Sequence, residues 1–256
     1  NKRCLTNSSW RLNQHIGFNM LDILSPQQFI EQHGQECGFS EWHKALDLQQ
    51  DAAIAAGENI RSIVNARAQS MDALLKFLWQ QHDLPYDDLA LIAVGGYGRH
   101  ELLPYSDVDL LILSQQALSS ELAEQVSGFV SSLWDAGLKP GMSVRSLSEC
   151  LEAAQDITVA TTLVESRLII GDSQLAKKPR QIVATAWTDK TFYEAKLNEQ
   201  KRRYAQHHNT ESNLEPDIKN APGGLRDLNQ IGWIAKRHFR VMRVYDLVHL
   251  GFISDY

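Results

Sequence analysis

Residues 89–113 read LALIAVGGYGRHELLPYSDVDLLIL, and the architecture of the chain follows from them. The apolar residues 89–94 predict a buried strand that runs directly into a glycine turn at Gly95 and Gly96. After a short loop, Asp107 and Asp109 open a second apolar strand over 108–113. Residues two apart in a strand point to the same face, so we expect both carboxylates to project together near the turn.

Two carboxylates beside a glycine turn predict a site for a nucleoside triphosphate with Mg²⁺. Carboxylate oxygens are ligands that Mg²⁺ prefers, and glycine lets a backbone approach phosphates closely. Residues 110–113 are all apolar, as in a strand covered on both faces, where two charged neighbours need a compensating cation. The alternative is a plain tight turn followed by two solvated acids. The spacing matches neither a Walker A loop nor a dinucleotide-binding Gly-x-Gly-x-x-Gly motif.

Three motifs resemble the bacterial PII uridylyltransferase/uridylyl-removing enzymes, a family of the nucleotidyltransferase superfamily. They are the glycine turn with its Asp-x-Asp strand, LVESRLIIGD at 163–172, and NLEPDIKNAPGGLRD at 213–227. The resemblance covers roughly residues 89–240 and little of residues 1–60. It implies an α/β fold: a small mixed nucleotidyltransferase sheet with an N-terminal helical region and a C-terminal helical domain.

The resemblance also implies an activity. Family members transfer UMP from UTP to a tyrosine hydroxyl of the PII nitrogen-regulatory protein and release pyrophosphate. Asp107 and Asp109 would then be the catalytic residues and would hold Mg²⁺. The family carries an HD hydrolase domain and two glutamine-sensing ACT domains as well. We expect neither in this chain, which we expect to be part of a longer protein, and we expect the His82-Asp83 dipeptide not to bind metal.

A third carboxylate is usual in this superfamily, on the third strand. Here residues 141–146 read GMSVRS and contain no acid. We expect Asp217 to complete the metal site, with Glu165 as the other candidate. The alternatives are that Asp217 caps or holds Lys219 and that Glu165 is a solvated helix residue.

Basic and glycine residues of the three motifs are expected to hold the triphosphate, because arginine forks suit phosphate oxygens and lysine acts as a point charge. They are Gly95, Gly96, Arg99, Ser106, Arg145, Lys219, Gly223, Gly224 and Arg226. We expect the Gly223–Gly224 bend to open a helix over 227–240, whose free N-terminal N–H groups would favour an anion. The alternative for the basic residues is ordinary surface pairing, for example Arg226 with Asp227.

The chain divides into three predicted regions: an N-terminal helical region over 1–83, the nucleotidyltransferase domain over 84–172, and a helical nucleotidyltransferase-associated domain over 173–256. In the first, Met71, Leu74, Leu75 and Leu78 follow helical spacing. In the second, an amphipathic helix is predicted over 119–135, and Pro140 and Gly141 suggest that a strand over 138–147 lies at an edge or carries a bulge.

Composition limits the class of protein. The net charge of −6 argues against a protein that coats nucleic acid, so we expect PII and UTP as partners and neither nucleic acid nor membrane. Cys4, Cys37 and Cys150 match neither a disulfide framework nor a zinc motif, which favours the cytoplasm. Two other functions stay open: a protein adenylyltransferase of the glutamine synthetase adenylyltransferase type, and a non-catalytic nucleotide-sensing module.

Overall fold

The computed structural model describes residues 24–34, 38–206, 217–241 and 245–254. Contacts divide the chain into two compact units, one of Asn1–Ser146 with Arg167–Ala176 and one of Leu147–Ser166 with Lys177–Tyr256. The division into three functional regions, with boundaries at residues 84 and 173, stays a prediction.

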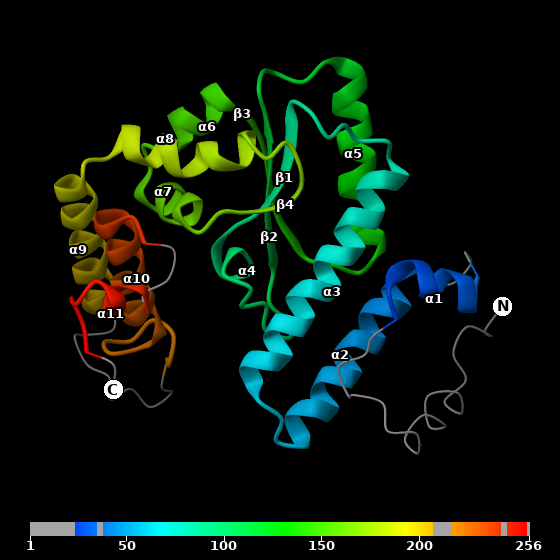
Figure 1. Cartoon of the computed structure of the whole chain (residues 1–256), viewed down its shortest axis with the longest axis horizontal. Helices are drawn as coiled ribbons and strands as arrows, with labels where there is room; N and C mark the ends of the chain where they lie inside the picture. Colours follow the sequence, from blue (N-terminus) through cyan, green and yellow to red (C-terminus); the bar gives the residue numbers. More distant parts are fainter. Residues whose placement is uncertain (1–23, 35–37, 207–216, 242–244, 255–256) are drawn as a thin grey trace. The chain divides into compact units, whose positions relative to one another are not determined.

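The first unit is built on a four-stranded mixed sheet (Figure 1). Its strands are β1 Leu89–Ala93, β2 Val108–Ser114, β3 Pro140–Ser146 and β4 Arg167–Gly171, in the order β3-β2-β1-β4. Strand β1 is antiparallel to β2 and β4, whereas β2 and β3 are parallel. The α/β expectation and the edge position of the third strand are confirmed. Strand β3 pairs with β2 in one continuous register, so Pro140 and Gly141 begin the strand and do not form a bulge.

The first unit also contains helices. They are α1 Pro26–His33, α2 Phe39–Ala55, α3 Ile60–Gln81 and α5 Ser120–Asp135, with the short α4 Gly95–Gly98 after β1. Helix α3 contacts β4, and α1, α2 and α5 pack on α3. Alternate strand residues such as Leu89, Leu91 and Leu110 share one core with these helices, as the two-residue period of a strand requires. The predicted helix over 119–135 begins at Ser120, because the Ser119 hydroxyl caps it by accepting from the Leu122 N–H group.

The apolar stripe of α3 is buried as predicted, with Met71, Leu74 and Leu75 fully inaccessible. The apolar run of β2 is buried as well, which confirms a strand covered on both faces. His82 ends α3, and its ring contacts Phe129 edge-on at 6.3 Å between ring centres. This packing supports a structural role for the His82-Asp83 dipeptide.

The second unit is helical. It contains α6 Leu147–Ala153, α7 Ile157–Val164, α8 Lys178–Ala186, α9 Asp189–Gln206, α10 Leu225–Phe239 and the short α11 Asp246–His249; the 3-10 turn η2 Leu175–Lys177 precedes α8. Helix α9 packs on α10, and α8 packs on α6 and α7. The helix that was predicted over 227–240 begins two residues earlier than expected, at Leu225.

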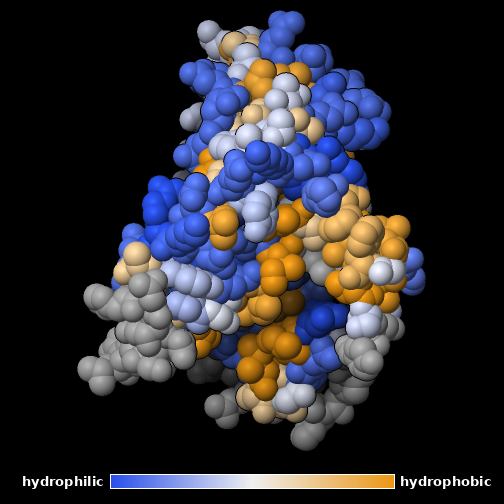
Figure 2. Space-filling view, turned by 90° about the vertical axis from the view of Figure 1, so that its left-hand side faces the viewer, coloured by the Kyte–Doolittle hydropathy of each residue, from blue (hydrophilic) through white to orange (hydrophobic). Residues whose placement is uncertain are grey.

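One face of α10 is apolar and exposed. Leu225, Leu228 and Ile231 recur at helical spacing and are each more than half exposed, whereas Trp233 is buried. Figure 2 looks at the side that carries α9 and α10 and shows apolar side chains gathered there. Within the described ranges, no helix combines the length and apolar character needed to span a bilayer. Cys150 is buried and forms no disulfide among the described residues, and Cys4 and Cys37 lie outside them.

Candidate active site

The glycine turn is the short helix α4, placed directly at the end of β1 (Figure 1). Gly95 adopts φ +59°, a left-handed conformation that favours glycine. The first intrahelical hydrogen bond runs from the Gly98 N–H group to the Val94 carbonyl, at 3.0 Å. The N–H groups of the three preceding residues have no acceptor within the helix, as at any helix start. Such a turn presents backbone donors beside the beginning of β2.

The carboxylate of Asp109 occupies space that two glycines leave empty. A Cβ atom added to Gly95 would lie 3.1 Å from Oδ2 of Asp109, and one added to Gly141 would collide with Oδ1. Gly141 lies directly opposite Asp109 in the parallel pairing of β2 with β3. The sequence alone did not indicate this role, because Pro140-Gly141 is also typical of a strand edge.

Asp107 and Ser106 lie in the exposed loop just before β2. The same loop holds two residues other than glycine in the left-handed region, His100 at φ +62° and Tyr105 at φ +64°. Such conformations are costly and cluster at functional sites. The Tyr105 hydroxyl donates to Oδ2 of Asp51 at 3.1 Å, which anchors the loop to α2. The strained loop therefore marks the approach to Asp107 and Asp109.

A largely buried polar cluster of Asp72, Tyr97 and Arg167, here called the clamp, joins α4 to α3 and β4. The Tyr97 hydroxyl donates to Asp72 of α3, and Arg167 of β4 donates to both carboxylate oxygens of Asp72 at 2.7 and 3.0 Å. The Arg167 guanidinium also lies 5.2 Å from the centre of the Tyr97 ring. Burial, and then the charge of Asp72, raises the pKa of Tyr97, so its hydroxyl keeps its proton and remains a donor.

This clamp was also missed. Tyr97 and Arg167 lie within recognised motifs but had no assigned role, and Asp72 stands in α3 where an acid usually indicates a solvated face. Its function depends on two partners that are 25 and 95 residues away in the sequence.

Two residues of the first unit that were predicted to bind phosphate, Arg99 and Arg145, make other contacts in the structure. Arg99 ends α4, and its Nε donates to Oε2 of Glu101 at 2.7 Å. Arg145 pairs in register with Leu113, four residues along β3 from Gly141, which is about 13 Å in a strand. Arg145 therefore does not lie beside Asp109. Their contact with a triphosphate stays a prediction.

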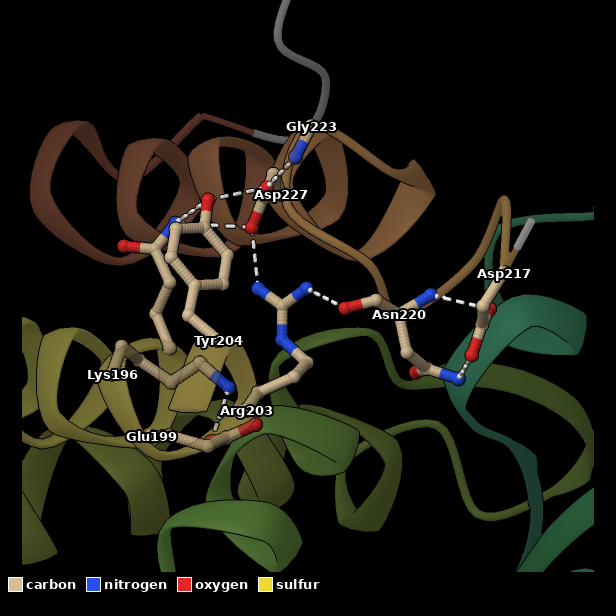
Figure 3. A network of polar contacts seen from close by, with 9 residues as sticks. Lys196, Glu199, Arg203, Tyr204, Asp217, Asn220, Gly223 and Asp227 are labelled. Atoms are coloured by element: carbon tan, nitrogen blue, oxygen red, sulfur yellow. Dashed lines mark hydrogen bonds and ion pairs between the residues drawn. The ribbon is translucent and has the colours of Figure 1, made fainter. Parts of the chain in front are cut away.

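In the second unit, Asp217 organises the predicted loop (Figure 3). Its Oδ1 accepts from the backbone N–H groups of Lys219 and Asn220, at 2.9 and 2.8 Å, and Oδ2 accepts from the Asn220 side chain at 3.1 Å. This turn matches the alternative in which Asp217 holds Lys219 in place. A metal-binding role for Asp217 stays a prediction. Residues 213–216 of the motif lie outside the described residues.

The first backbone donors of α10 are not free. The N–H group of Leu225 donates to the Ile218 carbonyl and that of Arg226 to the Lys219 carbonyl, both at 2.9 Å, and Asp227 N–H donates to Gly224 at 3.0 Å. The expectation that this helix start offers free N–H groups to an anion is therefore wrong.

Gly224 makes this arrangement possible. A Cβ atom there would lie 2.9–3.1 Å from three loop carbonyl oxygens, so only glycine admits them. Gly223 takes φ +79° and faces open space. The Pro-Gly-Gly bend thus closes the loop on itself. Its two glycines serve the loop's own geometry, and any phosphate contact would come from the side chains of Lys219 and Arg226.

Asp227 is the centre of this loop's polar network (Figure 3). Oδ2 accepts from the Tyr204 hydroxyl at 2.6 Å and from Gly223 N–H at 2.7 Å, while Oδ1 accepts from Arg203 and Gln200. Burial alone would raise the pKa of Asp227, but these hydrogen bonds outweigh it and lower the pKa to about 2. Asp227 forms its ion pair with Arg203 of α9, and not with Arg226 as the alternative of surface pairing had it.

Glu165, the other candidate for the third acid, ends α7. Its side chain is buried, and its Oε1 lies 3.2 Å from the Lys236 ammonium. The alternative that it is a solvated helix residue is wrong. Among the described residues, no three His, Cys, Asp or Glu side chains gather as they would around a metal ion. Mg²⁺ often uses only one or two carboxylates together with substrate phosphates, so Asp107 and Asp109 fit as its donors.

Comparison with known proteins gives two family matches. The family model of the nucleotidyltransferase domain matches residues 72–163, and that of the GlnD PII-uridylyltransferase matches residues 191–256. The sheet and its glycine turn therefore form a nucleotidyltransferase fold, as the sequence predicted.

Curated relatives agree. The chain is 59% identical over 237 residues to a bifunctional uridylyltransferase/uridylyl-removing enzyme of Acinetobacter baylyi, with 91% of the chain covered. It is 57% identical over 230 residues to the enzyme of that name from Acinetobacter baumannii, and 50% identical over 225 residues to one from a Psychrobacter species. The aligned part is 27%, 26% and 25% of these relatives, so the chain spans about a quarter of their length.

We predict that Gly141→Ala weakens binding of Mn²⁺ with UTP by about tenfold or more, since a displaced carboxylate loses charge-assisted contacts worth roughly 1.5–3 kcal/mol. The added methyl group must push the Asp109 carboxylate from its place. Electron paramagnetic resonance of Mn²⁺ measures the binding, and thermal melting reports folding. Ser143→Ala, two residues further along the same face of β3, is the matched control. Equal affinity in the Gly141 variant and the wild type contradicts this geometry.

We predict that Asp227 makes the second unit sensitive to acid. Its folded pKa of about 2 lies below the unfolded value of 3.8, so its contribution to stability is present above pH 4 and is lost as the pH falls toward 2. Thermal melting between pH 2 and pH 6 measures this loss. In Asp227→Asn, the melting temperature should be lower at pH 6 and should fall less steeply in acid. An identical acid slope in both proteins contradicts the prediction.

Proposed function

We propose that this chain, which is homologous over nine tenths of its length to the bifunctional uridylyltransferase/uridylyl-removing enzymes, carries out their uridylyl transfer. In this reaction UMP passes from UTP to a tyrosine hydroxyl of a PII protein, and pyrophosphate is released. The observation that supports it best is the Asp109 carboxylate, seated between Gly95 and Gly141 beside the glycine turn that follows β1. The names of these relatives favour a uridylyl over an adenylyl group.

The donor set at the turn suits a metal ion. Nucleotidyltransferase domains generally use a divalent metal, and we propose Mg²⁺, held by Asp107 and Asp109. When bound, Mg²⁺ would neutralise charge that develops on the transferred phosphorus. Asp217 remains our candidate for a third ligand. The carboxylate of Asp109 already lies beside the turn, in the space that the two glycines leave.

The chain's own groups would mainly bind and orient. The Gly95–Gly96 turn and Arg99 would hold the triphosphate, with Ser106 and Arg145 as further candidates and Lys219 and Arg226 contributing from the second unit. The tyrosine oxygen attacks the α-phosphorus, the bond from that phosphorus to the bridging oxygen breaks, and pyrophosphate leaves. The tyrosine proton passes to Asp107, Asp109 or the third acid. The nucleophile comes from the partner, so this chain needs none of its own. We place the reaction in the cytoplasm.

Nucleotide choice and acceptor decide between the candidate functions. The purified chain is incubated with PII, Mg²⁺ and each labelled nucleoside triphosphate, and the PII mass and released pyrophosphate are measured. Label on PII from UTP alone supports the proposal. Label from ATP indicates an adenylyltransferase instead. Tight UTP binding without pyrophosphate release indicates a nucleotide-sensing module and overturns the proposed reaction.

We predict that Asp107→Asn and Asp109→Asn each lower the rate of transfer by about a hundredfold or more, since the charge stabilisation a metal supplies is worth several kcal/mol. Turnover and thermal melting are measured for both variants. The melting temperature should change little at Asp107, which is exposed. Asp87→Asn, in the loop before β1, is the matched control. Full activity in both site variants would contradict the catalytic and metal-binding role proposed for these carboxylates.

We predict that Lys219→Ala and Arg226→Ala weaken UTP binding by about tenfold each, because a charged hydrogen bond contributes roughly 1.5–3 kcal/mol. The backbone of this loop already satisfies its own donors, so the contact must come from the side chains. Calorimetric titration of UTP measures the affinity, and Lys201→Ala on α9 serves as control. If both variants keep the UTP affinity and turnover of the wild type, the loop before α10 has a structural role only.

A further inference from the structure

The second unit contains a cavity whose wall is almost entirely basic or aliphatic. Its volume is about 140 Å³. A single buried water needs only roughly 10–15 Å³ by this kind of measure, so a phosphate-sized ion has room. The lining residues are Val164, Arg180, Val183, Lys236, Arg237, Arg240 and Val241. Four basic residues thus line one small cavity in a chain whose net charge is −6.

Part of this charge is already paired. Lys236 binds Glu165, while Asp189 pairs with Arg237 and lies 3.7 Å from Arg240. Arg237 also donates to the Trp187 carbonyl. It is only 6% exposed, and its Nε has no hydrogen-bond partner among the described residues. A buried donor of this kind is costly unless a ligand or water accepts from it.

The helix dipole explains only part of the cluster. Cations are favourable at the end of a helix, which accounts for Lys236 and Arg237 in the last turn of α10. Arg180 comes from α8, and its guanidinium donates to the Ser166 carbonyl at 2.9 Å. Arg240 takes a left-handed conformation at φ +58°, where glycine is the usual residue. Burial lowers the pKa of the Arg180 and Arg237 guanidinium groups, as expected where cations are partly desolvated.

We propose that this cavity, the basic pocket, binds a tetrahedral oxyanion of the phosphate type. Guanidinium groups approach from α8 and from the end of α10, so a ligand with acceptors in several directions satisfies them better than a planar carboxylate. The aliphatic part of the wall, Val164 and Val183, raises the strength of such contacts by excluding water. The proposal does not depend on the uridylyl-transfer reaction.

The test uses inorganic phosphate and the whole 256-residue chain. Phosphate binding is measured by calorimetry and by the shift in melting temperature, with sodium chloride added to keep ionic strength constant. We expect phosphate and sulfate to bind and to stabilise the fold more than acetate or chloride. Arg180→Gln and Arg240→Gln should each weaken phosphate binding by about tenfold, as for loss of one charged hydrogen bond.

Controls separate the pocket from general charge and from the proposed reaction. Arg202→Gln, at an exposed position of α9, should leave phosphate affinity unchanged. Asp109→Asn should lower the rate of transfer by about a hundredfold or more yet keep phosphate binding, so failure of the proposed reaction does not mimic failure of the pocket. If Arg240→Gln weakens the binding of UMP as much as that of phosphate, the natural ligand is a nucleotide phosphate. If only phosphate binding is weakened, the ligand is a free ion. No preference for phosphate over chloride, or equal weakening in Arg202→Gln, overturns the proposal.

Discussion

Close approach of three backbone segments around one carboxylate is the constraint on which the candidate site depends. The end of β1, the beginning of β2 and the beginning of β3 meet at Asp109. A side chain at Gly95 would crowd its carboxylate, and one at Gly141 would collide with it. Because protein interiors are close-packed, the absence of these two Cβ atoms is what leaves room for the carboxylate at this position. The mixed pairing of the sheet, parallel on one side of β2 and antiparallel on the other, creates that geometry.

The position of the glycine turn depends in turn on the clamp behind it. Asp72, Tyr97 and Arg167 belong to a helix, a turn and an edge strand, and one carboxylate joins them. Removing the Asp72 carboxylate takes this acceptor from both Tyr97 and Arg167 where they are partly or fully buried, which is costly. The second unit uses the same principle at Asp227, which joins α9 to the loop before α10. In both units, one acid with several donors holds a glycine-rich segment in place.

Local patterns predicted the fold well but the long-range roles poorly. The apolar runs of β1 and β2 and the stripes of α3 and α5 were readable, because burial imposes a period of two or of 3.6 residues on neighbouring positions. The role of Gly141 could not be predicted in this way, since it depends on the register between two strands. The helix start at Leu225 was also misjudged, because its donors are satisfied by loop carbonyls that only Gly224 admits. The basic pocket joins α7, α8 and α10, so no single stretch of sequence contains it.

The clamp also limits how far the nucleotidyltransferase domain can be shortened from its N-terminal side. Asp72 lies in the second half of α3, well before the first strand, and the nucleotidyltransferase match begins at that same residue. A domain excised at the start of the sheet would keep every strand and both aspartates of the Asp-x-Asp pair. It would nevertheless lose the acceptor for Tyr97 and Arg167 and the helix that covers the core. For protein engineering, the minimal transferable module therefore includes all of α3, although α3 carries none of the residues proposed to touch substrate.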